Sequence, residues 1–194
     1  MALAVYNKKR NFKKTPEPKG KGGNKNQFRF VIQRHDASRL HYDFRLELGG
    51  VLKSWAVPKG PSMNPADKRL AVMVEDHPVS YINFKGEIPE GNYGAGTVEI
   101  WDKGLFLPID KNHEKITEKQ ALEAIKKGEL KIFLKGDKLE GEFVFVRLKK
   151  AGFSNEQSEK NWLLIKHKDE YAVKNKYDSE KFRAAGSGKK KSKK

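Results

Sequence analysis

The chain alternates apolar and polar residues in many short segments. The longest alternation runs without a break over residues 40–48, where Leu40, Tyr42, Phe44, Leu46 and Leu48 stand against His41, Asp43, Arg45 and Glu47. A period of two is typical of a strand that buries one face and exposes the other. From this and similar patterns we predict strands at residues 28–33, 40–48, 51–57, 69–76, 80–85, 97–101, 130–134, 142–148 and 162–166.

Turn residues separate several of these strands, and one helix lies among them. Turns are predicted at Gly49-Gly50, Asp102-Lys103-Gly104 and Gly136-Asp137. The helix begins at Thr117, because Thr117 and Gln120 have the spacing of a capping box, and it ends at Gly128. Many short strands at this spacing predict a barrel or a closed sandwich.

Positive charge is concentrated at the two ends of the chain. The 194 residues carry 41 Lys and Arg against 25 Asp and Glu, a net charge of +16. Residues 1–27 and 174–194 each carry +7, whereas residues 28–173 carry +2. We therefore predict a flexible basic N-terminal arm (1–27), a folded domain (28–173) and a basic C-terminal tail (174–194). Such blocks favour a polyanion, although a solubilising tail or linker has the same composition.

Composition excludes several classes of site. The chain has no cysteine, so it has no disulfide framework, no thiolate zinc site and no cysteine nucleophile. No apolar stretch approaches the roughly 20 residues of a membrane-spanning helix, and the basic N-terminus lacks a signal-peptide core. These features predict a cytoplasmic protein with no membrane partner.

The polar face of the strand at 40–48 carries the candidate chemistry. His41, Asp43 and Arg45 follow one another along it at roughly 6–7 Å, twice the strand rise. His35 can supply a third ligand from across a hairpin. Two imidazoles and a carboxylate suit a divalent transition metal with open coordination positions. The alternative is a solvated strand face that binds no metal.

Two other residues add to the candidates. His77 ends a further alternating segment. Lys59 lies on a stiff loop between Pro58 and Pro61 and can contact an anion, although an ordinary solvated lysine has the same surroundings.

The motif His35-x5-His41-x-Asp43-x-Arg45 resembles the metal motif of the 3′-phosphoesterase domain of bacterial DNA ligase D, which also occurs as a free-standing protein. The resemblance begins near Tyr6 and runs to Asp169, nearly everything except the C-terminal tail. Other segments that resemble the family are Trp55-Ala56-Val57-Pro58-Lys59-Gly60-Pro61, Arg69-Leu70-Ala71-Val72, Glu75-Asp76-His77-Pro78, Tyr81 and Ile88-Pro89-Glu90-Gly91-Asn92-Tyr93-Gly94.

The resemblance implies a mainly β fold, a compact antiparallel β-barrel with one or a few short helices and an active site on its outer surface. It implies a metal-dependent DNA 3′-end-processing phosphoesterase that uses Mn²⁺, or another divalent transition metal. This activity would remove 3′-phosphates and terminal 3′-ribonucleotides during end joining of double-strand breaks. The partners would be DNA 3′ ends and, in end joining, a DNA ligase, a polymerase and Ku. We further expect a monomer associated with the prokaryotic nucleoid.

The resemblance also assigns roles to residues. His35, His41 and Asp43 would hold the metal. The groups that would surround the phosphate, for catalysis or substrate binding, are Arg45, Lys59, Arg69, His77 and Tyr81. Gln33 and Glu75 match supporting positions in substrate binding. The family uses acidic residues of the N-terminal arm for some activities, but this arm is almost wholly basic, so none of them is carried over.

These residues suit phosphate hydrolysis on their own terms. Arg45 can hold a phosphate with its planar fork. His77, expected to titrate near neutral pH, can either protonate the leaving oxygen or stabilise its charge. Two alternatives stay open: a non-haem iron oxygenase, which also uses two histidines and a carboxylate, and a non-catalytic DNA-binding scaffold that works through its arms.

Overall fold

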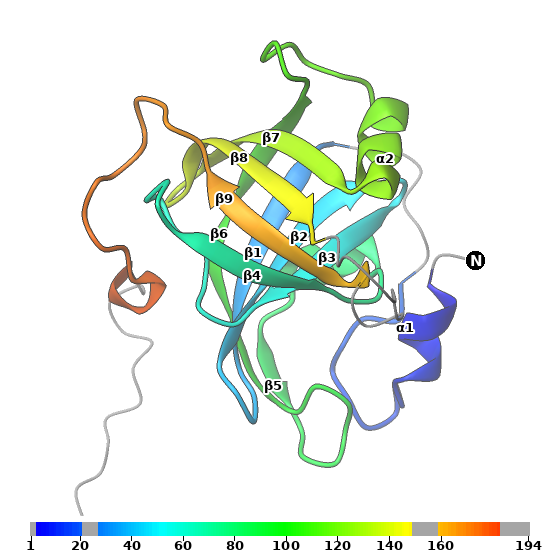
Figure 1. The fold of residues 1–194 in the computed structure, drawn as a ribbon. Helices are drawn as coiled ribbons and strands as arrows, with labels where there is room; N and C mark the ends of the chain where they lie inside the picture. The colour runs from blue at the N-terminus through cyan, green and yellow to red at the C-terminus, as the bar shows by residue number, and fades with distance from the viewer. Residues whose placement is uncertain (1–2, 21–26, 149–158, 183–194) are drawn as a thin grey trace, which may run out of the picture.

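The computed structural model describes residues 3–20, 27–148 and 159–182 (Figure 1). Its nine strands are β1 (Arg29–Asp36), β2 (His41–Leu48), β3 (Val51–Val57), β4 (Lys68–Met73), β5 (Gly86–Ile88), β6 (Gly96–Ile109), β7 (Glu129–Gly136), β8 (Glu140–Arg147) and β9 (Asn161–Lys166). Two α-helices and two 3₁₀ turns accompany them: α1 (Ala4–Lys8), α2 (Glu118–Lys127), η1 (Val79–Asn83) and η2 (Ser179–Phe182).

Eight of the strands close into an antiparallel barrel. Their order is β1-β2-β3-β4-β9-β8-β7-β6, and β6 pairs back onto β1. The short strand β5 extends the sheet at the edge of β6. The predicted fold, a mainly β antiparallel barrel with few short helices, is confirmed.

The long strand β6 corrects one predicted turn. Residues 102–104 continue the strand, and the register against β1 shifts between Ile32 and Gln33, which leaves Trp101 as the extra residue of a bulge. Asp102 is buried, and its carboxylate accepts backbone N–H groups of residues 103, 137, 138 and 139 at 2.9–3.2 Å. The hydrogen bonds of the Asp102 carboxylate therefore connect β6 to the turn between β7 and β8.

The other predicted elements agree unevenly with the structure. Helix α2 has its capping box at Thr117 and Gln120 and ends at Gly128 in the left-handed region, as expected. Strand β4 ends at Met73, short of the predicted residue 76. The predicted strand at 80–85 is wrong: Tyr81 and Ile82 are both buried, so this segment forms the turn η1 instead of an alternating strand.

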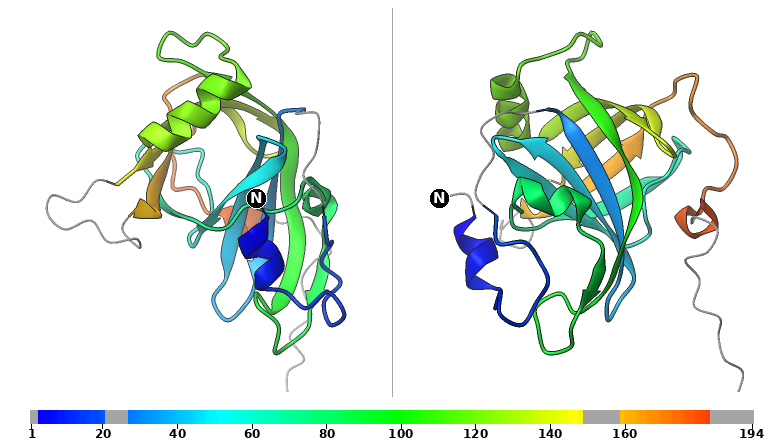
Figure 2. Two further views of the ribbon diagram at one scale, coloured as in Figure 1. Left: turned by 90° about the vertical axis from the view of Figure 1, so that its right-hand side faces the viewer. Right: turned by 180° about the vertical axis from the view of Figure 1, so that it is seen from behind.

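Two separate apolar cores hold the structure together. The larger fills the barrel, where the Trp55 ring lies 4.5 Å from that of Phe145. The smaller lies outside it and joins α1 and η1 to the strands, with buried members Leu3, Tyr6, Val31, Val51, Leu52, Tyr81 and Ile82. Figure 2 shows α1 and η1 beside the barrel on the same side. Residues 3–20, expected as a flexible arm, are therefore packed against the fold.

The C-terminal segment also packs in part. Tyr177 and Ser179 are buried, and the Trp101 indole donates to the carbonyl oxygen of Ser179 at 3.1 Å. The first residues of the predicted tail thus cover one end of the barrel, whereas its lysine-rich part, 183–194, lies outside the described residues. In the described part of the chain no helix is long and apolar enough to cross a membrane.

Replacing Tyr6 by Ala tests whether the N-terminal segment stabilises the fold. Tyr6 is fully buried, so Tyr6→Ala should lower the free energy of unfolding by about 3 kcal/mol, as other large aromatic truncations do. Val5→Ala is the matched control, because Val5 is 54% exposed on the same helix, and its effect should stay within about 0.5 kcal/mol. Urea unfolding measures both. Equal midpoints for Tyr6→Ala and the wild type would mean that this segment contributes nothing.

Candidate active site

Two neighbouring strands bring the candidate metal ligands together. In the β1–β2 hairpin His35 lies opposite His41, and Gln33 lies opposite Asp43. Opposed residues of an antiparallel pair project to the same face. Here that face is the outside of the barrel, because the alternate residues of β2 belong to the interior core. The predicted approach of His35 across a hairpin is confirmed.

The ligand atoms of His35, His41 and Asp43 lie within 4.8 Å of one another. Nδ1 of His35 is 3.5 Å from Oδ2 of Asp43, and Nε2 of His41 is 3.7 Å from Oδ1. The remaining ring nitrogens face the carbonyl oxygens of Gly94 and Arg39, each at 2.9 Å. A carbonyl oxygen only accepts, so those two nitrogens donate; in the neutral rings that a metal requires, the nitrogens that face Asp43 would be the ones that offer lone pairs. This donor set fits one divalent transition metal.

Arg45 is fixed beside the triad by three of its five N–H groups. Its Nη2 donates to Asp43 at 2.9 Å, its Nε to Gln33 at 2.7 Å, and its Nη1 to Ser54 at 2.9 Å. Gln33 in turn donates to the carbonyl oxygens of Tyr81 and Phe84. Within the described residues one N–H on each terminal nitrogen of Arg45 has no hydrogen-bond partner, and such a pair of N–H groups can donate to two oxygens of one anion.

The Asp43 carboxylate is held ionised by its neighbours. Burial alone would raise its pKa, but the Arg45 guanidinium and the two histidines more than offset this effect. The pKa of Asp43 therefore lies well below its usual range. An ionised carboxylate is the form that a metal requires.

The outer face of β1 and β2 is not solvated, which corrects the expectation of an exposed polar face. Gln33 is fully buried, Arg45 is 2% exposed and Asp43 is 7% exposed. Beside them lies a cavity of about 280 Å³, lined also by residues of the N-terminal segment, η1 and the loop that ends at Gly94. The site is thus a covered pocket on the barrel wall.

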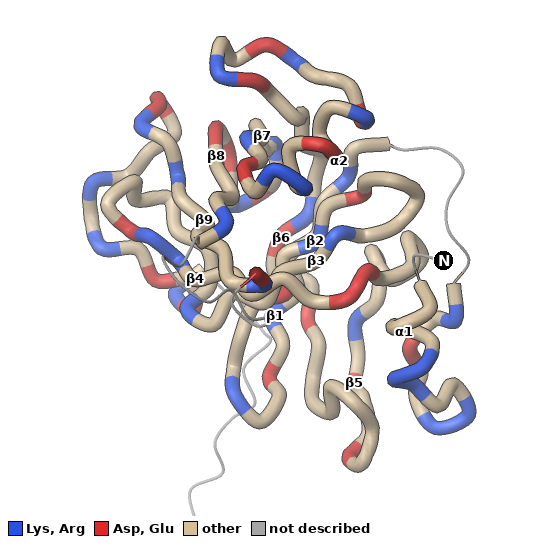
Figure 3. The backbone as a smooth tube through the Cα atoms, turned by 45° about the vertical axis from the view of Figure 1, so that its right-hand side comes forward, with Lys and Arg blue, Asp and Glu red and all other residues tan. Residues whose placement is uncertain are grey.

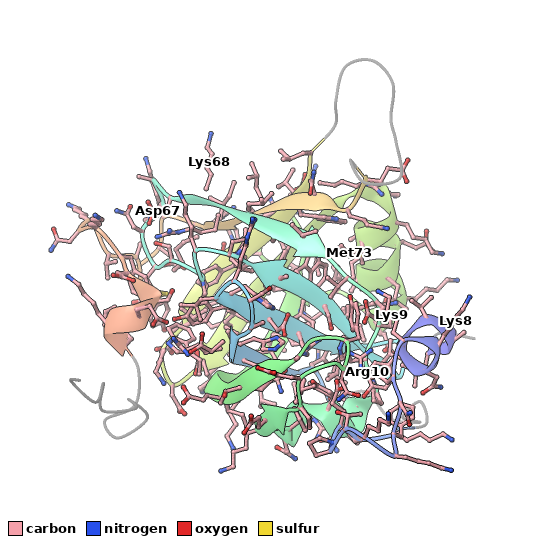
Figure 4. All side chains as sticks on the ribbon, turned by 90° about the horizontal axis from the view of Figure 1, so that it is seen from below. Lys8, Lys9, Arg10, Asp67, Lys68 and Met73 are labelled. Carbon is pink, nitrogen blue, oxygen red and sulfur yellow. The ribbon has the colours of Figure 1, made fainter. Side chains whose placement is uncertain are left out.

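The N-terminal segment contributes charged groups to this pocket. Arg10 donates to Glu17 at 2.8 Å and to Glu75 at 3.1 Å, and Lys9 donates to Glu75 at 3.0 Å. The Arg10 guanidinium also lies 3.9 Å from the centre of the Tyr6 ring. Figure 3 shows several positive residues clustered on this segment, and Figure 4 shows Arg10 on the side of the barrel where α1 lies.

His77 and Tyr81 also line the pocket. Nδ1 of His77 donates to the carbonyl oxygen of Glu75 at 2.9 Å, so its Nε2 accepts from Arg10 at 3.2 Å. Burial and the charges of Arg45 and Arg10 hold the pKa of His77 well below its ordinary value. The expected titration near neutral pH is therefore wrong for the free protein. The Tyr81 hydroxyl donates to Glu17 at 3.0 Å, and burial raises the pKa of Tyr81.

The comparison with protein families agrees with this geometry. Residues 33–147 match the family described as the DNA ligase D 3′-phosphoesterase domain. The chain belongs to this family.

Proteins similar to the chain have larger architectures. The chain is 49% identical over 170 residues to a multifunctional non-homologous end joining protein LigD of Pseudomonas aeruginosa. The matched residues make up 86% of the chain and 19% of that protein. The LigD protein of Mycolicibacterium smegmatis is 41% identical over 87% of the chain and 21% of its own length. That of Mycobacterium tuberculosis is 43% identical over 75% of the chain and 18% of its own length. The chain thus spans about a fifth of these relatives.

Not every residue assigned by resemblance lies in the pocket beside the triad. His35, His41, Asp43, Arg45, Glu75, His77 and Tyr81 line it, and Gln33 supports it through Arg45. Lys59 and Arg69 line a different cavity, at the end of the barrel near η2. Their part in binding substrate stays a prediction.

Sequence reasoning missed Arg10, Glu17 and Ser54. Arg10 and Glu17 precede the residues that match the family, in a segment dominated by lysine. The available signal was the pair Leu3 and Tyr6, whose spacing places two apolar residues on one face of a helical turn. Ser54 stands on a strand whose pattern shows no sign of its bond to Arg45.

The pKa of His77 can be measured directly. In the metal-free protein its ring resonances should not move between about pH 8 and pH 6, because the folded protein disfavours the charged ring. The unfolded chain takes up this proton near pH 6.5, so His77 lowers the free energy of unfolding as the pH falls below about 6.5. NMR of the histidine rings, assigned with His77→Gln, gives the measurement. A His77 midpoint near 6.5 would contradict the assigned environment.

Proposed function

We propose that this chain is a metal-dependent phosphoesterase that processes DNA 3′ ends. It removes 3′-phosphates and terminal 3′-ribonucleotides during end joining of double-strand breaks. The observation that supports this most is that one ring nitrogen each of His35 and His41 faces the Asp43 carboxylate, with all three ligand atoms within 4.8 Å, beside the guanidinium of Arg45. Family membership supports the same reaction and removes the support for an iron oxygenase.

The proposed metal is Mn²⁺, and His35, His41 and Asp43 would hold it. Imidazole and carboxylate ligands accept Mn²⁺ as well as other divalent transition metals. When bound, such an ion activates a phosphate oxygen as a Lewis acid and lowers the pKa of coordinated water. The hydrogen bonds from His35 to Gly94 and from His41 to Arg39 orient the rings for this role.

The phosphate is bound by Arg45 and kept in place by the groups around it. Arg45 offers two N–H groups at a fixed angle, because Gln33, Ser54 and Asp43 hold its plane. Tyr81 lies under the guanidinium, with 4.9 Å between the Arg45 carbon Cζ and the ring centre. The cavity of about 280 Å³ has room for a phosphate and part of a sugar.

His77 can take part in proton transfer only after it gains a proton. In the free protein its Nε2 accepts from Arg10 and carries none. A phosphate dianion bound nearby favours the charged ring and raises the pKa of His77. The protonated ring can then donate to the leaving 3′-oxygen.

DNA is the proposed substrate, and end joining is the proposed setting. The chain carries a net charge of +16, which favours a polyanion. Its relatives are named as multifunctional end-joining proteins. The partners that we propose for this chain are DNA 3′ ends and, in end joining, a DNA ligase, a polymerase and Ku.

Removal of one ligand tests the metal assignment and the reaction together. Wild-type protein with Mn²⁺ should release inorganic phosphate from a 3′-phosphorylated primer–template and should not do so with EDTA. His41→Ala should reduce release by more than the roughly 10–100-fold typical of partners outside the coordination shell, and it should weaken Mn²⁺ binding in calorimetry. His113→Ala is the control, because the His113 side chain is exposed and remote from the triad.

Two results would contradict these assignments. Full activity of His41→Ala would remove His41 from the metal site. If the wild type and His41→Ala bound DNA equally well and neither released phosphate with any metal, the scaffold alternative would be favoured.

Replacing Arg45 by Lys separates phosphate binding from metal binding. Lysine keeps the charge but loses the fork, so Arg45→Lys should reduce phosphate release by about 100-fold, as the loss of a transition-state donor does. Mn²⁺ affinity should stay near that of the wild type. Arg29→Lys on β1 is the matched control, because Arg29 pairs with Glu47 away from the pocket. Wild-type turnover in Arg45→Lys would exclude bidentate binding by Arg45.

A further inference from the structure

A second cavity, of about 360 Å³, lies at the end of the barrel. We propose that it binds an internucleotide phosphate of the same DNA strand, upstream of the reacting 3′ end. This inference rests on the proposed function. It also gives a place in substrate binding to Lys59 and Arg69, which do not line the metal pocket.

Three cations from separate parts of the chain line this cavity. Lys59 follows β3, Arg69 is on β4, and Lys176 comes just before η2. Residues 176–180 thus form about half of the lining of this cavity. Figure 4 shows Asp67, which also lines this cavity, on the side of the molecule nearer η2 and away from Arg10.

Three carboxylates line this cavity, Asp67, Asp178 and Glu180; two of them have cationic partners, whereas Asp178 forms no salt bridge within the described residues. Asp67 accepts from Ser62 at 2.6 Å and from Arg69 at 2.8 Å. Glu180 accepts from Arg34 at 2.8 Å and 3.0 Å. The negative charge of Asp67 and Glu180 is therefore largely compensated within the protein.

The positive charge is not compensated to the same extent. Within the described residues neither Lys59 nor Lys176 forms a salt bridge, and both are exposed at the rim. Arg69 donates through Nη2 to Asp67 and to the carbonyl oxygen of Tyr177, while its buried Nε has no partner in the described part of the chain. Two lysines without a salt bridge and one unpaired N–H donor outweigh the single unpaired carboxylate of Asp178, so the cavity favours an anion.

The position of this cavity fits a DNA strand that ends at the metal triad. His41 and Tyr42 are consecutive at the start of β2 and project to opposite faces, so the metal pocket that His41 lines and the second cavity that Tyr42 lines lie on either side of one strand. Ala56, near the end of β3, lines the first cavity, and Pro58 and Lys59, in the turn that follows this strand, line the second. Both cavities therefore lie at the same end of the β2–β3 hairpin, where a DNA strand that ends at the triad would place one of its upstream phosphates.

Equilibrium binding tests the subsite without any chemistry. The probe is a fluorescent primer–template with a 3′-OH end, titrated in EDTA with the wild type, with Lys59→Ala/Lys176→Ala and with Lys131→Ala/Lys135→Ala. The last pair removes the same charge from β7, outside this cavity. Arg69 is left intact because it also holds Asp67 and the Tyr177 carbonyl.

The salt dependence gives the expected size of the effect. The slope of log K against log salt is negative, and the loss of two phosphate contacts should reduce its magnitude by about 1.8. Raising the salt from about 50 to 200 mM should then weaken wild-type binding roughly ten-fold more than binding by Lys59→Ala/Lys176→Ala. An equal change in the β7 pair would overturn the subsite, because only general charge would then matter. Competition by inorganic phosphate as strong as that by an oligonucleotide would also overturn it, since the cavity would then bind any small anion.

Substrate length tests the position of the subsite. A nucleoside 3′-phosphate has no upstream phosphate, whereas a 3′-phosphorylated hexanucleotide reaches the second cavity. Lys59→Ala/Lys176→Ala should therefore lose much more kcat/KM on the hexanucleotide than on the nucleoside 3′-phosphate. Equal losses on both substrates would overturn the inference and assign these lysines to the reacting phosphate. If the wild type released no phosphate at all, the proposed function would fail, and the binding experiment would still decide whether the subsite exists.

Discussion

The buried ion pair between Arg45 and Asp43 is the interaction on which the pocket depends. A charge removed from water costs several kcal/mol unless its partners satisfy it, and here Asp43, Gln33 and Ser54 do so. Each of these partners is itself held: Asp43 by the hairpin register, Ser54 by its bond to the Leu52 carbonyl, and Gln33 by two carbonyls at η1. The orientation of the guanidinium is therefore fixed, and so are the directions of the two N–H groups that have no partner among the described residues.

This arrangement requires the outer wall of the barrel to be covered, and the cover is built by the second apolar core. Tyr6 and Tyr81 meet edge to face at 6.2 Å, and Tyr81 donates to Glu17. Arg10 then links Glu17 to Glu75 across the pocket. Apolar packing thus places the cations of the N-terminal segment where Glu17 and Glu75 accept their hydrogen bonds. The same packing keeps water away from Arg45, which strengthens its electrostatic interactions.

Local pattern predicted the barrel strands and the triad, because both depend on neighbours in sequence or across one hairpin. Alternation alone put His41, Asp43 and Arg45 on one face, and the short link to His35 allowed a hairpin. The cover was not predictable in this way. Arg10 and Glu17 meet residues some 60 positions later, and their charge pattern is that of a disordered arm. The predicted turn at residues 102–104 was wrong for a different reason, because an Asp-x-Gly segment has the same composition in a turn and beside a β-bulge.

The charges of the pocket explain why phosphate binding should depend on a metal. Two cations, Arg10 and Arg45, and three carboxylates, Glu17, Glu75 and Asp43, line the pocket. Lys9, next to the lining, pairs with Glu75 and balances the count. A phosphate dianion entering this balanced pocket would meet no net attraction, and it would compete with carboxylates for Arg10 and Arg45. Under the proposed function, a divalent ion on the triad adds two positive charges, which match the dianion. The triad and the arginines thus act as one unit, because Asp43 is bonded to Arg45 and would also be a ligand of the metal.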